Sequence, residues 1–175
     1  YLAIAMAELG NISERRVSQL IMGLRGLPEF LIANSGLNSG FMIPQYAAAS
    51  MVSQNKMYCY AASSDSIVSS NGQEDHVSMG TTAARHAYSI IRNARKVLAI
   101  EAICAAQAAD FHGSGRLSAF GENLHRNIRS IVPVITADRV FSKDIEELAA
   151  AMNTEDWIMK VMDNANSEES SLHEV

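Results

Sequence analysis

Apolar and polar residues alternate along this chain with the period of α-helices. The longest such segment, from Thr81 to Phe111, contains neither Gly nor Pro and predicts one helix of about 45 Å. Its apolar face carries residues at seven-residue spacing and small residues on the adjoining ridge, namely Ile91, Leu98 and Ala105 with Ala87, Ala94 and Ala108. Small side chains let helix axes approach closely, which predicts bundle packing. Glu101 falls on the same face and should pair with an Arg of another helix or chain.

Shorter helical patterns precede this segment. Residues 1–9 read as the end of a helix that Gly10 and Asn11 stop, and a second helix runs from Glu14 to about Leu24. The next helix begins near Phe41, after a loop that is rich in Gly, Asn and Ser.

Three more helices follow the long one. The first covers about residues 117–132, and the other two begin with Ser142 and Thr154 as predicted N-caps. No segment alternates with the period of a β-strand, so the predicted fold class is all-α, a long-helix bundle. We expect the bundle to occupy residues 1–165 and the acidic residues 166–175 to form a loose tail.

The composition excludes several classes of protein. Apolar residues make up 48% of the chain and aromatic residues only 6%, which suits close-packed helices. The net charge of -5 and the absence of a basic block argue against nucleic acid as a partner. No run of 18 apolar residues predicts a membrane span. Cys59 and Cys104 lie far apart, as expected for reduced thiols in a cytoplasmic protein, and the histidine spacing predicts no metal site.

Residues 71–79 combine two amides, two carboxylates and an imidazole directly before the long helix. In one interpretation Asp75 or Ser78 merely caps that helix, because helix N-termini favour acidic and hydroxyl side chains. In the other interpretation this stretch forms a binding or catalytic site together with the Gly-rich loop at 34–42. The Ser-rich segment 61–73 predicts a surface loop.

Several short motifs resemble the histidine ammonia-lyase family in their order and spacing. They are Leu2-Ala3-Ile4, Ile12-Ser13-Glu14-Arg15-Arg16, Gly36-Leu37-Asn38-Ser39-Gly40-Phe41-Met42-Ile43, Ser53-Gln54-Asn55-Lys56, Asp65-Ser66, Gln73-Glu74-Asp75-His76-Val77-Ser78-Met79, Leu98-Ala99-Ile100-Glu101, and Phe141 with Asp144-Ile145-Glu146. The resemblance covers most of residues 1–147 and corresponds to roughly the last third of the full enzyme. It implies that the chain is the C-terminal part of something longer.

The resemblance also implies an activity. Members of this family eliminate ammonia from L-histidine without oxidation to give trans-urocanate, and they assemble as homotetramers whose active sites draw on more than one subunit. Their electrophile is a methylidene-imidazolone (MIO) formed from an Ala-Ser-Gly triplet. The triplet is absent here, because Ala49-Ser50 continues to Met and Ala62-Ser63 to Ser. The MIO would therefore form upstream, and this chain alone is expected to be inactive.

Three residues match site positions of the family. Glu74 matches the active-site glutamate, which would hold the substrate imidazole or exchange a proton with its amine. The phenylalanine-specific branch has an amide there, and it has a Lys at the substrate-facing position matched by Met42. Both residues therefore favour an imidazole substrate. Gln73 flanks Glu74 and is expected to support substrate binding through its amide.

Some positions depart from the family pattern and leave alternatives open. Tyr60-Ala61 stands in place of His-Pro, and Pro44, Val68 and Gly72 also differ. One alternative is a lyase or 2,3-aminomutase of the same family that acts on another aromatic amino acid. The other is a catalytically inert helical fragment that serves only in assembly.

Overall fold

The structure is a computed structural model that describes residues 1–162, and the predicted tail at 166–175 lies outside them. The described residues form helices and no strand, which confirms the all-α fold class. The helices are α1 (Leu2–Leu20), α2 (Met42–Tyr58), α3 (Gly80–His112), α4 (Ala119–Arg129) and α5 (Ser142–Ala151), with a further helical segment at 155–162. Short 3-10 turns occur at η1 (Ala62–Ser64), η2 (Ser70–Gly72) and η3 (Ser114–Arg116).

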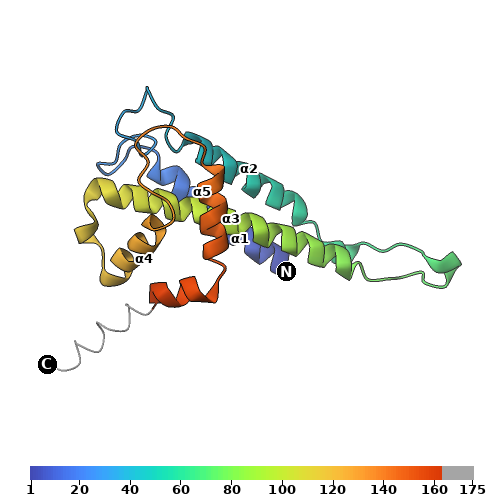
Figure 1. Ribbon diagram of the computed structural model, residues 1–175. Coiled ribbons are helices and arrows are strands. Elements are labelled where there is room, and N and C mark those ends of the chain that lie inside the picture. The colour runs from blue at the N-terminus through green and yellow to red at the C-terminus, as the bar shows by residue number, and fades with distance from the viewer. Residues whose placement is uncertain (163–175) are drawn as a thin grey trace.

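Helix α3 is the spine of the molecule. It has 33 residues and a length of about 50 Å, and its ends lie within one residue of the prediction. Helices α1 and α2 run alongside it, α5 crosses it, and α4 packs near its C-terminal end (Figure 1). The N- and C-terminal halves of the chain therefore meet on one helix.

The buried face of α3 is displaced by one residue from the predicted face. Leu98 is 38% exposed and Ala105 is also exposed, so the predicted stripe was wrong. The core-facing residues are Ile90, Val97 and Cys104, with Ala87, Ala94 and Ala108 on the adjoining ridge as predicted. An alanine-rich helix has apolar residues on neighbouring faces, and only the packing of α1 and α2 decides which face is covered.

Helix α1 continues through the residues that were expected to stop it. Gly10 is buried against α2, where an added Cβ would lie 3.5 Å from Asn55 Nδ2, so glycine serves close packing at this position. Asn11 Nδ2 donates to Glu8 Oε2 at 2.9 Å within the helix instead of competing for its backbone. The helix ends at Leu20, earlier than predicted, and Gly23 follows with a φ of 69°.

The ion-pair partner of Glu101 and two of the helix caps were also predicted. The expected partner of Glu101 is Arg16 of α1, whose Nη1 lies 3.2 Å from Glu101 Oε1. Thr154 is confirmed as a cap, because its Oγ1 accepts a hydrogen bond from Trp157 N at 3.3 Å. Ser142 is not a cap: Ile145 N bonds to Phe141 O at 3.0 Å, so α5 starts from Phe141.

The fully buried side chain of Gln107 ties two connecting segments to α3. Its Nε2 donates to Leu31 O at 3.2 Å and to Ile135 O at 2.8 Å. Its Oε1 accepts from Ile135 N at 3.1 Å and from Arg129 Nη2 at 3.2 Å. The loop after α1 and the segment 133–141, called the strap below, are thereby fixed to the same point of α3.

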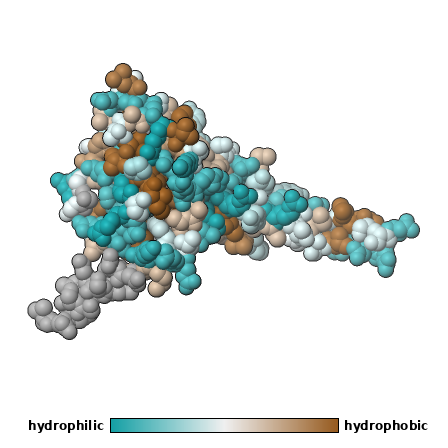
Figure 2. Space-filling view, in the orientation of Figure 1, coloured by the Kyte–Doolittle hydropathy of each residue, from teal (hydrophilic) through white to brown (hydrophobic). Residues whose placement is uncertain are grey.

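The surface carries apolar patches outside the core. In Figure 2 apolar residues gather near the far end of the segment between α2 and α3, where Ile67 and Val68 are 56% and 66% exposed. Leu37 is also exposed, at the opposite end of α2. Within residues 1–162, no helix has both the length and the apolar character that crossing a membrane requires.

Gln107→Ala tests the tie between α3 and the two segments. In the complete protein we expect it to reduce the free energy of unfolding by roughly 3 kcal/mol, because it leaves several buried backbone groups without partners. Thermal or urea unfolding measures the loss. Gln19→Ala, at an exposed position of α1, should change stability by less than about 0.5 kcal/mol. Equal effects of the two changes would contradict the role given to Gln107.

Candidate functional site

Residues 59–79, called the arm below, project from the body of the molecule between α2 and α3 (Figure 1). Near its far end Ser69 N donates to Glu74 O at 2.8 Å, and Glu74 N donates to Ser69 O at 3.3 Å. The Ser69 hydroxyl also bonds to Glu74 Oε2 at 3.1 Å. These contacts fix both the backbone and the carboxylate of Glu74, so its position does not depend on the end of a helix.

The turn that joins Ser69 to Glu74 is left-handed. Ser70, Asn71 and Gly72 have φ values of 53°, 56° and 85°. A left-handed backbone costs a non-glycine residue on the order of 1–2 kcal/mol, although Asn tolerates it better than most. Strained backbone of this kind clusters at active sites and ligand clamps. The segment 61–73 is a surface loop, as predicted, with a defined turn at its end.

Gln73 and Glu74 are both exposed on the arm. Within the described residues Glu74 forms no ion pair, and the Ser69 hydroxyl bonds to only one of its two carboxylate oxygens, Oε2. An ionised carboxylate in this setting can accept a hydrogen bond from an N–H group, or accept a proton. The neighbouring amide of Gln73 can both donate and accept.

The capping interpretation of residues 71–79 was wrong. Helix α3 has Met79 at its N-cap position, and no side chain there accepts a capping hydrogen bond. The connection is held from elsewhere, because Val77 N donates to Ser66 Oγ at 3.0 Å across the arm. Asp75 and Ser78 are exposed and do not cap the helix.

The Gly-rich loop at 34–42 leads into α2 at the other end of that helix. Phe41 is fully buried, its ring lies 5.2 Å from that of Phe141, and its N–H donates to Phe30 O at 3.0 Å. Met42 is half-buried, and its N–H donates to Ser39 O at 3.1 Å. Gly40 passes so close to Phe30 that an added Cβ would lie 2.5 Å from Phe30 O.

A mostly apolar cleft of about 390 Å³ lies beside this loop. It is lined by Ser39, Gly40, Ile43, Pro44, Ala47, Asp138, Arg139, Val140, Phe141, Ser142 and Ile145. The loop, the start of α2 and the strap therefore share one surface. Sequence patterns did not reveal this cleft, because its two walls lie about a hundred residues apart.

The two predicted parts of the site do not meet within one chain. Met42 opens α2, whereas Gln73 and Glu74 lie on the arm beyond the last residue of α2, Tyr58. The helix alone spans about 25 Å at 1.5 Å per residue. In Figure 1 the arm extends away from the loop end of α2. A small molecule cannot touch Met42 and Glu74 of the same copy.

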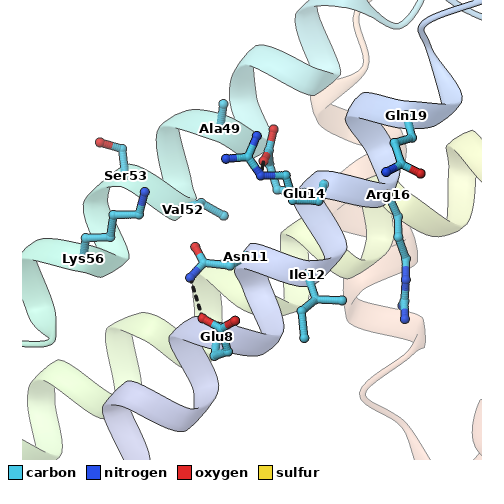
Figure 3. Close-up of a pocket in the computed structure, with 11 residues that line it drawn as sticks. Glu8, Asn11, Ile12, Glu14, Arg16, Gln19, Ala49, Val52, Ser53 and Lys56 are labelled. Atoms are coloured by element: carbon cyan, nitrogen blue, oxygen red, sulfur yellow. Dashed lines mark hydrogen bonds and ion pairs between the residues drawn. The ribbon is translucent and has the colours of Figure 1, made fainter.

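A second cleft, of about 640 Å³, separates α1 from α2. Figure 3 shows Ser53 and Lys56 on one wall and Glu8 and Asn11 on the other. Two of the sequence motifs, at 12–16 and 53–56, thus line the same space. Its walls carry both signs of charge.

Metal and thiol chemistry find no support in the described residues. Within 1–162, His, Cys, Asp and Glu side chains do not gather in groups of three or more that would hold an ion. Both cysteines are free, as predicted. Burial, with a smaller contribution from Glu101, raises the pKa of the Cys104 thiol far above its usual range, so Cys104 is an inert core residue.

Sequence comparison finds relatives along almost the whole chain. A sequence model of the aromatic amino acid lyase family matches residues 1–130. A histidine ammonia-lyase of Bacillus subtilis (strain 168) is 51% identical over 172 residues, which are 96% of this chain and 33% of the relative. One of Geobacillus kaustophilus is 59% identical over 151 residues, 85% of this chain and 30% of the relative. The chain thus spans about a third of the length of the curated relatives it matches.

Solved structures give the same picture of the fold. The crystal structure of histidine ammonia-lyase from Trypanosoma cruzi matches with a TM-score of 0.86 and 42% identity, over 93% of this chain and 32% of that one. Tyrosine aminomutase from Streptomyces globisporus matches with a TM-score of 0.87 and 34% identity, over 93% and 31% of the two chains.

Gly40→Ala tests the close approach of the loop to Phe30. It adds a steric clash to the cost of a positive φ, so we expect the complete protein to lose roughly 2–4 kcal/mol of stability. Gly36→Ala is the matched control: its φ of 98° is also positive, but nothing lies within 4 Å of the new Cβ. Thermal unfolding compares the two, and a loss at Gly36 as large as that at Gly40 would exclude the clash as the cause.

Proposed function

Because this chain belongs to the aromatic amino acid lyase family, we propose that it is the C-terminal part of a histidine ammonia-lyase. The complete enzyme would eliminate ammonia from L-histidine and release trans-urocanate. The observation that carries this proposal is identity of 51–59% to histidine ammonia-lyases over most of the chain. Helical packing alone would not select the substrate, since an aminomutase shares the same fold.

Glu74 is the residue of this chain that we assign to the chemistry. The imidazole ring of histidine presents an N–H group, and a carboxylate is the acceptor that best complements it. The same carboxylate can instead exchange a proton with the substrate amine, which must leave as ammonia. The three hydrogen bonds between Ser69 and Glu74 support either role, because they hold the carboxylate in one orientation before substrate arrives.

Gln73 and Met42 are assigned to substrate binding. Gln73 lies next to Glu74 on the arm, where its amide can bond to the substrate or to that carboxylate. Met42 offers an uncharged, adaptable thioether at the start of α2. An uncharged side chain there is compatible with an imidazole ring as substrate.

The separation of Met42 from Glu74 supports an active site shared between copies of the protein. The length of α2 exceeds that of any amino acid, so one substrate would contact Met42 of one copy and Glu74 of another. We propose a homo-oligomer, and a tetramer in keeping with the family resemblance. Exposed apolar residues on the arm, such as Ile67 and Val68, suit contacts with a neighbouring subunit.

The electrophile must come from outside this chain, since no Ala-Ser-Gly triplet is present. An MIO group formed upstream would supply the electron-poor carbon that activates the substrate amine for departure. The exposed carboxylate of Glu74, free of ion pairs within residues 1–162, fits a role in handling protons beside such a group.

The complete enzyme would work in the cytoplasm on small molecules. Free cysteines and the relatives' identity favour the cytoplasm as its location. We retain residues 1–165 as a helical portion of a larger enzyme and 166–175 as its acidic tail. We propose small-molecule substrates, rather than nucleic acid or membrane, as its ligands.

Two alternatives make different predictions. An aminomutase would return an isomerised amino acid rather than a free acrylate, and the match to tyrosine aminomutase is the observation that keeps this candidate open. A fragment used only for assembly would accompany an upstream sequence without an Ala-Ser-Gly triplet. Determining that upstream sequence therefore distinguishes a fragment used only for assembly from part of an MIO-dependent enzyme.

Glu74→Gln tests the assigned carboxylate. In the complete enzyme we expect kcat to fall by on the order of 10²–10⁴, because the amide keeps the shape but cannot take up a proton. Release of urocanate, followed by ultraviolet absorbance, measures the rate. Asp75→Asn is the matched control on the adjacent exposed carboxylate and should retain normal turnover. Unchanged turnover of the Glu74 variant would remove this residue from the mechanism.

Met42→Lys tests the binding assignment. We expect the KM for L-histidine to rise on the order of tenfold, since an ammonium group loses hydration when the ring docks beside it. Initial rates across a range of histidine concentrations give the value. Met57→Lys places the same charge on the far end of α2, at a 77% exposed position, and should leave KM unaltered. Normal KM in both variants would refute the role of Met42.

A further inference from the structure

The Gly-rich loop before α2 is held by one side chain from the strap. Asp138 Oδ2 accepts a hydrogen bond from Ser39 N at 2.9 Å, and Asp138 Oδ1 accepts one from Gly40 N at 2.8 Å. In return, Asp138 N donates to Asn38 Oδ1 at 3.1 Å. Three hydrogen bonds thus join two segments that lie about a hundred residues apart in the chain.

The chemistry of this contact favours a carboxylate. Both oxygens of Asp138 face backbone N–H groups on consecutive residues, so each bond is charge-assisted and the pair fixes the direction of the loop. The amide group of an Asn could accept only one of them, and its NH2 would face the other N–H. Neither Ser39 nor Gly40 has begun the helical hydrogen-bond ladder, so their N–H groups need an outside acceptor.

Met42 lies two residues after Gly40, the second residue whose N–H group Asp138 binds. Its N–H donates to the carbonyl of Ser39, the residue whose own N–H is held by Asp138. Phe41, between them, is locked by its bond to Phe30 O and by its buried ring. The backbone from Ser39 to Met42 therefore takes its position from the strap and not from α2 alone.

The strap is itself well anchored on either side of Asp138. Ile135 is buried and bonded twice to Gln107 of α3, and Phe141 packs its ring on Phe41. Arg139 is occupied by an ion pair with Asp144 at 2.9 Å, so it does not compete for the Asp138 carboxylate. A rigid support behind an acceptor is what positioning of a loop requires.

We propose that Asp138 is a positioning residue for substrate binding, which acts by holding the loop that carries Met42. This inference rests on the proposed function, because it takes the start of α2 as part of the substrate site. Asp138 lies outside residues 1–130, the part matched by the family. It belongs to none of the motifs that resemble the histidine ammonia-lyases, and only the folded chain brings it to the loop.

The test uses Asp138→Asn in the complete, assembled enzyme. We expect the KM for L-histidine to rise on the order of tenfold with kcat changed less than about threefold, since a displaced binding group weakens substrate contacts. Hydrogen exchange at the amides of Ser39 and Gly40 should accelerate by at least about tenfold. Light scattering confirms that the variant keeps the wild-type assembly.

Two further variants separate positioning from general damage. Glu147→Gln makes the same chemical change on an exposed residue of α5, whose only ion pair within residues 1–162 is with exposed Lys143, and should leave KM and exchange unaltered. Met42→Ala and the double variant complete a cycle. If Asp138 acts through Met42, the double variant raises KM no more than the larger single change, because coupled residues are not additive.

Each result decides the inference. Faster exchange at Ser39 and Gly40 with normal KM would make Asp138 a purely structural contact and overturn the proposal. A raised KM without faster exchange would also overturn it.

If Met42→Ala raises KM while Asp138→Asn does not, the inference fails and the proposed function stands. If Met42→Ala has no effect while Asp138→Asn raises KM and accelerates exchange, the loop is still positioned by Asp138 and only the Met42 assignment fails. Wild-type enzyme without turnover of any aromatic amino acid would remove both together.

Discussion

The lengths of two adjacent helices determine how far apart the candidate site residues of this chain lie. Helix α2 has 17 residues and lies against the 33-residue α3, and neither contains a break that would let its ends approach. Met42 is therefore held at one end and Glu74 beyond the other. Because a helix resists compression, no local adjustment of the chain joins these residues into one pocket. In the proposed function both residues contact one substrate, so a second copy must supply one of them.

Each end of this helical pair is held by hydrogen bonds that lie outside the helices themselves. On the arm, Ser69 and Glu74 close a left-handed turn that presents the carboxylate. At the loop, Asp138 binds consecutive N–H groups ahead of α2. Neither segment contains an α-helix or a strand, so these hydrogen bonds provide the rigidity that such an element would otherwise supply. Precise placement of the proposed substrate-contacting groups is thus compatible with exposed, irregular segments.

Exposed apolar surface is a consequence of the same organisation. Leu98 and Ala105 face away from the core of this chain, and Ile67 and Val68 lie uncovered on the arm. The chain spans about a third of the length of its relatives, so such faces are expected where the rest of a complete protein and its copies pack. The cleft between α1 and α2, whose walls carry charges of both signs, is another uncovered surface of this kind.

Local sequence determined most of the helices but not the contacts between them. The absence of Gly and Pro from 81–111 was enough to define α3, and Thr154 was enough to identify a cap, because both depend on neighbouring residues. The motif around Glu74 identified a candidate carboxylate. Sequence could not choose between two apolar stripes on α3 or show that Gly10 packs within a helix. Nor could it bring Asp138 to Gly40, since a contact of this kind arises only when distant segments fold against one another.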